Sequence, residues 1–189
     1  SLADIGARLG RVPADAAWDI VLAAYPQRAM GLFHLMTEQD VETALQFPWT
    51  SIGSDAGVAE QPGGVAQGLA HPRAYGTFPR VIARYVKERK VLTLEQAIRK
   101  MTSWSAARMG LPGRGVLQVG MAADVTVFDL EQLADVSTYA EPTRYPRGVR
   151  YVLVNGVVVV DEGRHTGRTP GVVLRGSGFR AATGGRSTR

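Results

Sequence analysis

Apolar residues recur at helical spacing through the first quarter of the chain. They predict one helix that ends at Gly10 and a second helix with Pro13 in its first turn. A third helix is predicted to open at the capping-box-like sequence from Thr37 to Asp40 and to end before Pro48. The apolar positions behind these predictions are Leu2, Ile5, Leu9, Ala16, Ala17, Ile20, Val21, Ala24, Val41, Ala44 and Leu45.

The same spacing predicts two further helices in the middle of the chain. Pro79 is expected to begin one of them, with an apolar stripe that consists of Phe78, Val81, Ile82, Tyr85 and Val86. Thr93 and Gln96 form a capping box for the next helix, which is expected to end before Gly110. Its stripe consists of Leu94, Ala97, Ile98, Met101 and Trp104. Both stripes are typical of core packing.

Strands are predicted at two places between the helices and again from residue 115 onward. The short apolar runs 29–33 and 49–53 fit strands of βα units around a parallel sheet. After residue 115 the period changes to about two, and the run 123–128 alternates. The runs 149–154 and 157–160 are joined by Asn155-Gly156, which is a strong signal for a tight hairpin. The expected class is therefore α/β with a β module at the end.

Composition narrows the possible partners. The 189 residues are 45% hydrophobic and 21% charged, with no long apolar run and no pattern of a signal peptide, so we expect no membrane partner and a cytoplasmic location. The net charge of +5 includes four arginines after residue 174, and the remainder carries 18 basic and 17 acidic residues. We therefore expect no nucleic-acid partner. Cysteine is absent, which excludes a thiolate nucleophile and a thiolate metal site.

The candidate chemistry begins at Asp55. This carboxylate follows a predicted buried strand, and the expected loop of 24 residues after it is rich in polar and aromatic groups. Loops of this length in compact domains commonly shape a binding site. The alternative is that Ser54-Asp55-Ala56-Gly57 is only a structural turn.

Five segments resemble the C-terminal part of N-acyl-D-amino-acid deacylases, or D-aminoacylases, in the amidohydrolase superfamily. The resemblance covers residue 1 to about 175, and its most specific motif is HPRAYGTFPR, which starts at His71; the others are SIGSDAG, LTLEQAIRKMTSWSAARMGL, GRGVLQVGMAADVTVFD and YVLVNGVVVVDEGRHTGRTPGVVLR. It implies that residues 1–112 are the last βα units of a (β/α)8 TIM-like barrel, with residues 29–35 and 50–54 as its seventh and eighth strands. Residues 113–175 would be the C-terminal part of a small β-sandwich domain, and 176–189 a disordered tail.

The resemblance also implies zinc catalysis. Asp55 matches the family's catalytic aspartate, which takes a proton from a metal-bound water and returns it to the departing amine. The zinc ligands of the family are a His-x-His, a strand-end cysteine and two later histidines, and they are expected before Ser1. The three histidines here, His34, His71 and His165, do not form such a set, so no zinc ligands are assigned within this chain.

Substrate contacts are assigned to four residues. Arg73 is expected to receive the substrate carboxylate, and His71 to donate to the amide oxygen, with a role as a loop anchor as the alternative for each. Phe33 and Met36 are expected to line a pocket for apolar D-amino acids, although His34 departs from the family pattern there. Other expectations are that Tyr75 and Phe78 pack under the loop, and that His165 is exposed and inert.

The expected function is zinc-dependent hydrolysis of N-acyl-D-amino acids to a D-amino acid and a carboxylate. One alternative is another amidohydrolase of the hydantoinase or dihydroorotase kind, which cuts cyclic amides. Another is a non-catalytic fragment that needs a missing N-terminal half. Because two barrel strands cannot close a sheet, we also expect self-association or pairing with that half.

Overall fold

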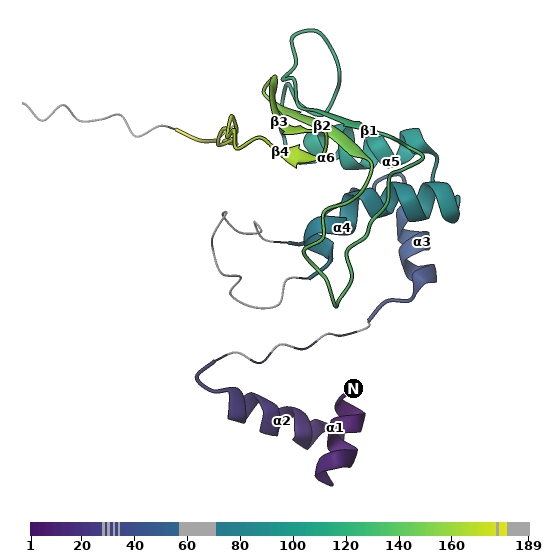
Figure 1. Ribbon diagram of the computed structural model, residues 1–189, viewed down its shortest axis with the longest axis vertical. Helices are drawn as coiled ribbons and strands as arrows, with labels where there is room; N and C mark the ends of the chain where they lie inside the picture. The colour runs from purple at the N-terminus through teal and green to yellow at the C-terminus, as the bar shows by residue number, and fades with distance from the viewer. Residues whose placement is uncertain are drawn as a thin grey trace, which may run out of the picture. The chain divides into compact units, whose positions relative to one another are not determined.

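The computed structural model describes residues 1–27, 29, 31, 33, 35–56, 71–176 and 178–180. The chain divides into two compact units, Ser1–Glu38 and Gln39–Arg189 (Figure 1). The predicted boundary near residue 112 stays a prediction for the whole protein. The predicted disordered tail falls largely outside the described residues.

The first unit is a pair of helices, α1 (Leu2–Leu9) and α2 (Pro13–Ala24), as predicted. Ser1 and Asp4 form a capping box at the start of α1, and Gly10 ends it with a left-handed φ of 61°. Gly6 permits a close turn between the helices, because a Cβ there would lie 2.7 Å from the Arg11 carbonyl oxygen. Several large apolar side chains of this unit are exposed, among them Leu9, Trp18 and Leu22. The expected self-association stays a prediction.

The second unit surrounds one apolar core. Its helices are α3 (Glu38–Gln46), which starts at the last residue of the first unit, α4 (Arg73–Arg80), the π-type helix η1 (Val81–Glu88), α5 (Leu94–Met101) and α6 (Ser103–Arg108). The buried core residues are Leu45, Val81, Ile82, Tyr85, Leu92, Ala97 and Leu133. The two predicted apolar stripes therefore face the core, except that Phe78 is 45% exposed and Trp104 is not among the residues that pack against the core.

The helix that was predicted to begin at Pro79 begins earlier, so this prediction was wrong. Pro79 lies inside α4, and the backbone N–H groups of Tyr75 and Gly76 donate to the Pro72 carbonyl, which closes the first turn. The turn widens in η1, where the Arg89 N–H donates to the carbonyl of Arg84, five residues back, at 2.7 Å. The predicted irregular loop is thus shorter than 24 residues, and residues 57–70 within it lie outside the described residues.

One predicted helix is broken into α5 and α6. The capping box at Thr93 is present, with Gln96 N–H donating to Thr93 Oγ1 at 3.2 Å. Thr102 then leaves the helical conformation, at φ −123°, and its hydroxyl donates to the Ile98 carbonyl. The hydroxyl of Ser105 donates to the Lys100 carbonyl at 2.7 Å. Side-chain hydroxyls that occupy helix carbonyls in this way favour a break.

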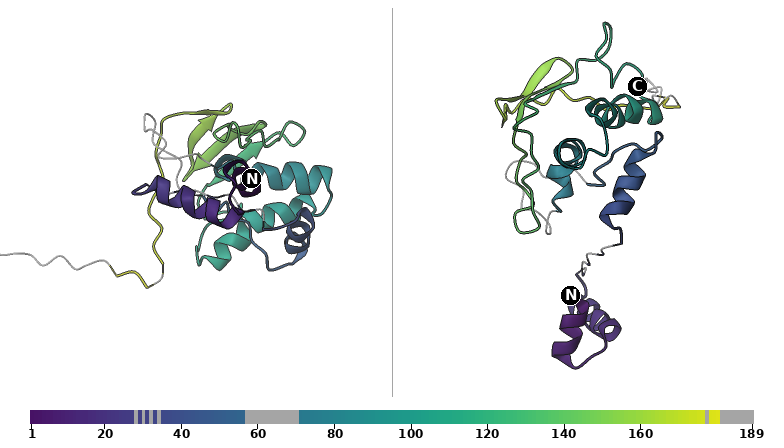
Figure 2. Two further views of the ribbon diagram at one scale, coloured as in Figure 1. Left: turned by 90° about the horizontal axis from the view of Figure 1, so that it is seen from below. Right: turned by 90° about the vertical axis from the view of Figure 1, so that its right-hand side faces the viewer.

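The β module forms one antiparallel sheet in the order β1 (Val125–Phe128), β2 (Val149–Val154), β3 (Val157–Asp161) and β4 (Arg164–His165). Figure 2 shows these strands on one side of the second unit, with helices beside them. The predicted hairpin at Asn155-Gly156 is confirmed, with φ angles of 48° and 80°. A second sheet of a sandwich is not formed by the described residues.

The predicted strands of the first half are not observed. Residues 49–53 are irregular, which corrects that prediction, and Ala29, Gly31 and Phe33 are not in a strand, while Met30 and Leu32 lie outside the described residues. A parallel strand exists only through hydrogen bonds to neighbouring strands. No such neighbour occurs near either run in the described part of the chain, so the barrel stays a prediction for the whole protein.

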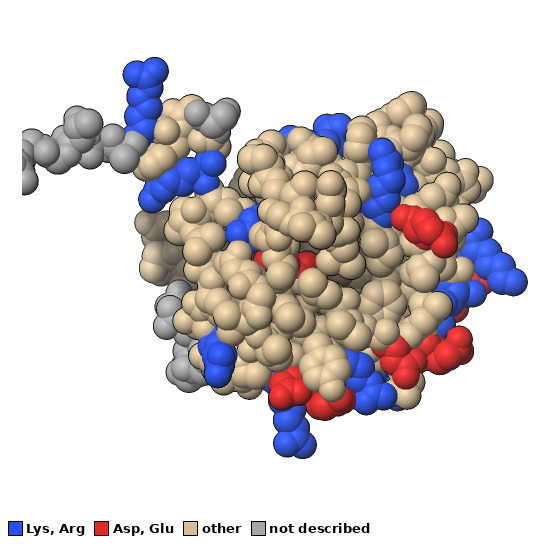
Figure 3. Space-filling view, turned by 90° about the horizontal axis from the view of Figure 1, so that it is seen from above, with Lys and Arg blue, Asp and Glu red and all other residues tan. Residues whose placement is uncertain are grey.

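Figure 3 shows acidic and basic side chains interspersed on the face that it displays. Within the described ranges, no helix combines the length and apolarity needed to cross a bilayer.

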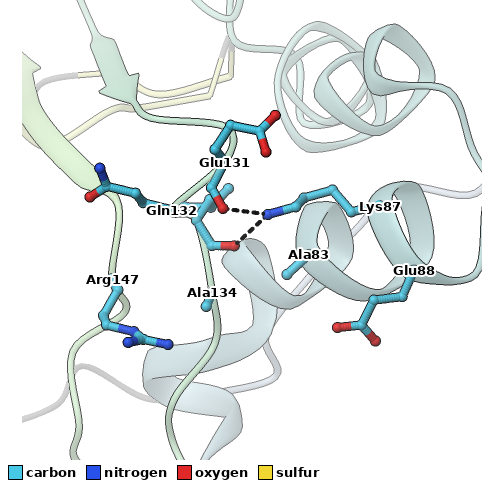
Figure 4. Close-up of a pocket in the computed structure, with 8 residues that line it drawn as sticks. Ala83, Lys87, Glu88, Glu131, Gln132, Ala134 and Arg147 are labelled. Atoms are coloured by element: carbon cyan, nitrogen blue, oxygen red, sulfur yellow. Dashed lines mark hydrogen bonds between the residues drawn. The ribbon is translucent and has the colours of Figure 1, made fainter.

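Two lysines hold main-chain segments against the helices. Lys100 on α5 is 4% exposed, and its ammonium group donates to the carbonyls of Phe47 and Thr50. Burial, followed by the charge of Arg99, lowers its pKa. Lys87 on η1 is half-buried and donates to the carbonyls of Glu131 and Leu133, at 2.9 and 3.4 Å, beside a cavity of about 300 Å³ (Figure 4).

A charged network holds the start of β1 to the hairpin. Asp124 accepts the backbone N–H of Asn155 at 2.8 Å and pairs with Arg114, whose other nitrogen donates to the Asn155 side chain at 2.7 Å. The Asn155 hydrogen bond and Arg114 keep the pKa of Asp124 below its ordinary value, although burial opposes this.

Lys100→Met is expected to lower the free energy of unfolding by about 2–4 kcal/mol, because it leaves two carbonyls without their buried donor. Lys87→Met, the matched control at a half-buried position, is expected to cost less than about 1.5 kcal/mol, since water can replace its ammonium group. Urea unfolding of both variants measures the difference. Equal losses would contradict the role assigned to Lys100.

Asp124→Asn is expected to lower the free energy of unfolding by about 1–3 kcal/mol at neutral pH. The pKa of Asp124 is lower in the folded state than in the unfolded state, where it is near 3.8. The carboxylate therefore contributes its full stabilisation above the unfolded-state pKa, and this stabilisation is lost as the pH falls through the folded-state pKa. The difference between variant and wild type should therefore shrink below about pH 4. Urea unfolding between pH 3 and pH 7 measures it, and a constant difference would contradict the assignment.

Candidate active site

Asp55 lies at the end of a segment that is anchored to the helices. The Thr50 hydroxyl donates to the Ala44 carbonyl of α3 at 2.6 Å, and the Ile52 N–H donates to the Lys100 carbonyl of α5 at 3.3 Å. Ile52 also packs against the core. The backbone is therefore fixed three residues before the candidate carboxylate, without a strand.

The side chain of Asp55 projects into solvent beside Arg73. Its carboxylate is 90% exposed, and its Oδ2 lies 3.2 Å from Nη2 of Arg73. The backbone of Asp55 has a φ of 48°, a left-handed conformation that aspartate tolerates better than most residues but that still carries some strain. Strained backbone of this kind is often found at functional sites, so the observation is consistent with a catalytic role.

His71 and Arg73 flank Pro72 at the start of α4. The Arg73 backbone N–H donates to Nδ1 of His71 at 3.0 Å. In the neutral imidazole the proton is then on Nε2, which lies 3.4 Å from the hydroxyl oxygen of Tyr139. The two rings meet edge to face, with centroids 5.2 Å apart. Asp55, His71 and Arg73 lie together as predicted, since Arg73 contacts both of the others, whereas Tyr139 was not predicted.

The β module reaches the same helix through Asp135 and Ser137. The Ser137 hydroxyl lies 3.2 Å from the Pro72 carbonyl oxygen and 2.6 Å from Oδ1 of Asp135, and Arg80 lies 3.7 Å from Oδ2 of Asp135. Sequence reasoning missed these contacts. The available signal was Gly76 within HPRAYGTFPR, because a glycine inside a helix indicates that something approaches closely.

The other predicted residues are placed as follows. Phe33 and Met36 belong to the first unit and are 76% and 72% exposed, so their role in the substrate pocket stays a prediction. His34 lies outside the described residues, and His165 on β4 is exposed, as predicted. Tyr75 packs edge to face on Tyr145, at 5.4 Å between centroids.

The metal-binding capacity of the described residues is limited. Among them, no three His, Asp or Glu side chains lie close enough together to hold a metal ion. Asp55 has a cation, Arg73, as its neighbour instead. The described residues therefore offer a carboxylate, a guanidinium and an imidazole at one place, open to solvent.

The comparison of the sequence with known families gives the class of protein. The chain belongs to the amidohydrolase family, whose profile matches residues 7–160. Within that family the resemblance to D-aminoacylases is confirmed. The chain is 41% identical, over 157 residues, to a D-aminoacylase of Alcaligenes xylosoxydans xylosoxydans; the match covers 83% of this chain and 31% of that enzyme.

Solved structures give the same relationship. A D-aminoacylase described by its binuclear metal centre superposes with a TM-score of 0.75 and 36% identity over 88% of this chain and 32% of that one. An N-acyl-D-glutamate deacylase of Bordetella bronchiseptica, complexed with zinc and a phosphonate inhibitor, superposes with a TM-score of 0.69 and 40% identity over 87% and 33%. The chain thus spans about a third of the length of these relatives.

Arg73→Met is expected to change the free energy of unfolding by less than about 1 kcal/mol, because exposed ion pairs contribute little. Thermal and urea unfolding of the variant measure this, with Lys100→Met as the destabilised comparison. A loss of several kcal/mol would mean that Arg73 is a structural anchor, which is the alternative that the sequence analysis left open.

Proposed function

We propose that this chain supplies the acid–base carboxylate and the carboxylate-binding edge of a hydrolase that converts N-acyl-D-amino acids to a D-amino acid and a carboxylate. The observation that carries the proposal is the pairing of Asp55 with Arg73 at 3.2 Å, in a chain 41% identical to a D-aminoacylase. A pairing of this kind suits a substrate that has an anionic group near the bond to be cut.

Asp55 acts as the base in the proposed reaction. Its exposed carboxylate takes a proton from the water that attacks the amide carbonyl, and it returns a proton to the nitrogen as the C–N bond breaks. Arg73 binds the substrate carboxylate through its guanidinium, which presents two parallel N–H donors to such a group. When substrate binds, the guanidinium exchanges its present partner, Asp55, for that carboxylate.

His71 is the donor that faces the amide oxygen in this proposal. Its Nδ1 is occupied by the Arg73 N–H, so a proton on Nε2 is the one available for donation. In the structure this nitrogen faces the Tyr139 hydroxyl.

Zinc is the cofactor that we propose for the complete enzyme, as in the structure of the Bordetella relative. A zinc-bound water is acidic enough for an ordinary carboxylate to deprotonate. The described residues of this chain do not form a zinc site, so the ligands would come from elsewhere in the assembled enzyme. Phe33 and Met36 are proposed to contact the substrate side chain, which favours apolar D-amino acids.

A hybrid enzyme tests this function. The matching third of the Alcaligenes D-aminoacylase is replaced by this chain, and racemic N-acetylmethionine is offered with zinc. D-methionine alone should be released, and Asp55→Asn should lower kcat by about 10²-fold or more, since a positioned acid–base group contributes about 10²–10⁴-fold. Asparagine also tolerates the left-handed backbone, so the fold is retained.

Three controls make the result decisive. Zinc content and circular dichroism of Asp55→Asn must equal those of the unsubstituted hybrid. Glu141→Gln, which removes an exposed carboxylate paired with Arg144 three residues away, should leave kcat unchanged. Release of L-methionine, hydrolysis of dihydroorotate or a hydantoin instead of the linear amide, or full activity of Asp55→Asn would each overturn the proposal.

A further inference from the structure

A short segment of the β module lies against the residues of the candidate site. It comprises residues 135–139 in the connection between β1 and β2, and we call it the clamp segment. Figure 1 shows this connection running from the sheet to α4. Its contacts with α4 and with His71 join parts of the chain that are about 65 positions apart in sequence.

The clamp segment touches α4 at a position that only glycine can occupy. A Cβ built on Gly76 would collide with Oδ1 of Asp135 and with the hydroxyl of Ser137. The Asp135 side chain is only 12% exposed and is paired with Arg80 of the same helix, so it has little room to move away. The distance between α4 and the clamp segment is therefore set both by Gly76 and by the restricted Asp135 side chain.

Ser137 extends this contact to the first turn of α4. Its hydroxyl oxygen lies 3.2 Å from the Pro72 carbonyl oxygen, and this carbonyl also accepts the N–H groups of Tyr75 and Gly76. The Ser137 N–H donates to Oδ1 of Asp135 at 2.9 Å, and the single hydroxyl proton of Ser137 is shared between that oxygen, at 2.6 Å, and the Pro72 carbonyl, at 3.2 Å. Pro72 separates His71 from Arg73, so a contact at its carbonyl holds the backbone from which both side chains extend.

Tyr139 adds the contact to His71 itself. Its ring stands edge to face on the imidazole, at an interplanar angle of 82°, with the hydroxyl oxygen 3.4 Å from Nε2. Tyr139 is 63% exposed, so core packing does not account for its place. Because Nδ1 accepts the Arg73 N–H, the Tyr139 oxygen is the acceptor that favours the proton on Nε2.

We propose that the clamp segment positions His71 and Arg73 for the substrate carboxylate and amide, with Tyr139 orienting the imidazole and Ser137 and Asp135 fixing the turn between the two residues. The inference rests on the proposed function for the identity of the substrate. Tyr139, Ser137 and Asp135 are positioning residues, since none of them is assigned a contact with the reacting atoms.

The first test uses the ring nitrogens of the histidines in the ¹⁵N-labelled chain. At about pH 8, where imidazole is neutral, two-bond ¹⁵N–¹H spectra distinguish the two neutral forms. His71 should carry its proton on Nε2. His165 is an internal control, because its Nδ1 also accepts a backbone N–H from two residues ahead, that of Gly167, at 3.0 Å.

Tyr139→Phe should shift the His71 Nε2 resonance and leave the His165 resonances in place. Tyr145→Phe is the matched control, because it removes a hydroxyl from an exposed tyrosine of the same connection that packs on Tyr75. Gly76→Ala should shift the His71 Nε2 resonance as well, although alanine favours the helix by about 1 kcal/mol. Its control is Gly171→Ala, where a Cβ has open space.

The second test measures binding of N-acetyl-D-methionine by the change in the Arg73 and His71 resonances. The corresponding amide, which lacks the carboxylate, should bind less well. Tyr139→Phe and Gly76→Ala should each raise the dissociation constant of the acid about 2–10-fold, which corresponds to one net hydrogen bond. The two control variants should match the wild type.

The proposal is overturned if His71 carries its proton on Nδ1, or if neither Tyr139→Phe nor Gly76→Ala changes its ring resonances. It is also overturned if the acid binds both variants as tightly as the wild type. The ring-nitrogen result does not depend on hydrolysis or on ligand binding, so an inactive hybrid enzyme would count against the proposed function alone.

Discussion

A buried ammonium group determines where the candidate site lies. Lys100 on α5 is buried, and its ammonium group binds the carbonyls of Phe47 and Thr50, just after α3 ends. Burying a charge is costly unless polar partners compensate for it, and the two carbonyls provide that compensation. The Phe47 carbonyl also accepts the Thr50 N–H at 3.2 Å, so the turn and the ammonium group are bound to each other. The chain that leaves this junction reaches Asp55 five residues after Thr50, so the position of the carboxylate depends on this buried contact.

Stability and chemistry are separated in this unit. Lys100, Asp135 and the apolar core residues are buried or nearly so, whereas Asp55, Arg73 and Tyr139 are exposed. Exposed ion pairs contribute little to folding, so the pairing of Asp55 with Arg73 is not explained by stability. The left-handed backbone of Asp55 adds a small cost that the anchored segment before it can tolerate. The exposed side chains of Asp55 and Arg73 are therefore available to a ligand.

Local signals predicted local structure well. The capping box at Thr93, the Gly10 helix end and the Asn155-Gly156 hairpin depend on neighbours within a few residues, and all three are present. Strands at 29–33 and 49–53 would depend on partners far along the chain, and the start of α4 depends on the Pro72 carbonyl. The same distinction applies to the site. HPRAYGTFPR placed His71 and Arg73 beside Asp55, but nothing near residue 139 indicated that Tyr139 would meet His71. Lys100 was missed because a charged residue on a helix is ordinarily expected at the surface.

The contact at Gly76 has a consequence for how such chains can recombine. The backbone of α4 at Gly76 and the side chains of Asp135 and Ser137 fit each other without space for a methyl group. The two segments are about 60 residues apart in sequence, but they must remain matched to each other. A crossover between homologues in the intervening sequence would join α4 from one parent to the β1–β2 connection from another parent. The fit between the two at Gly76 would then no longer be ensured. Gene shuffling that aims at new substrate preference would keep more of its progeny folded if both stretches came from the same parent.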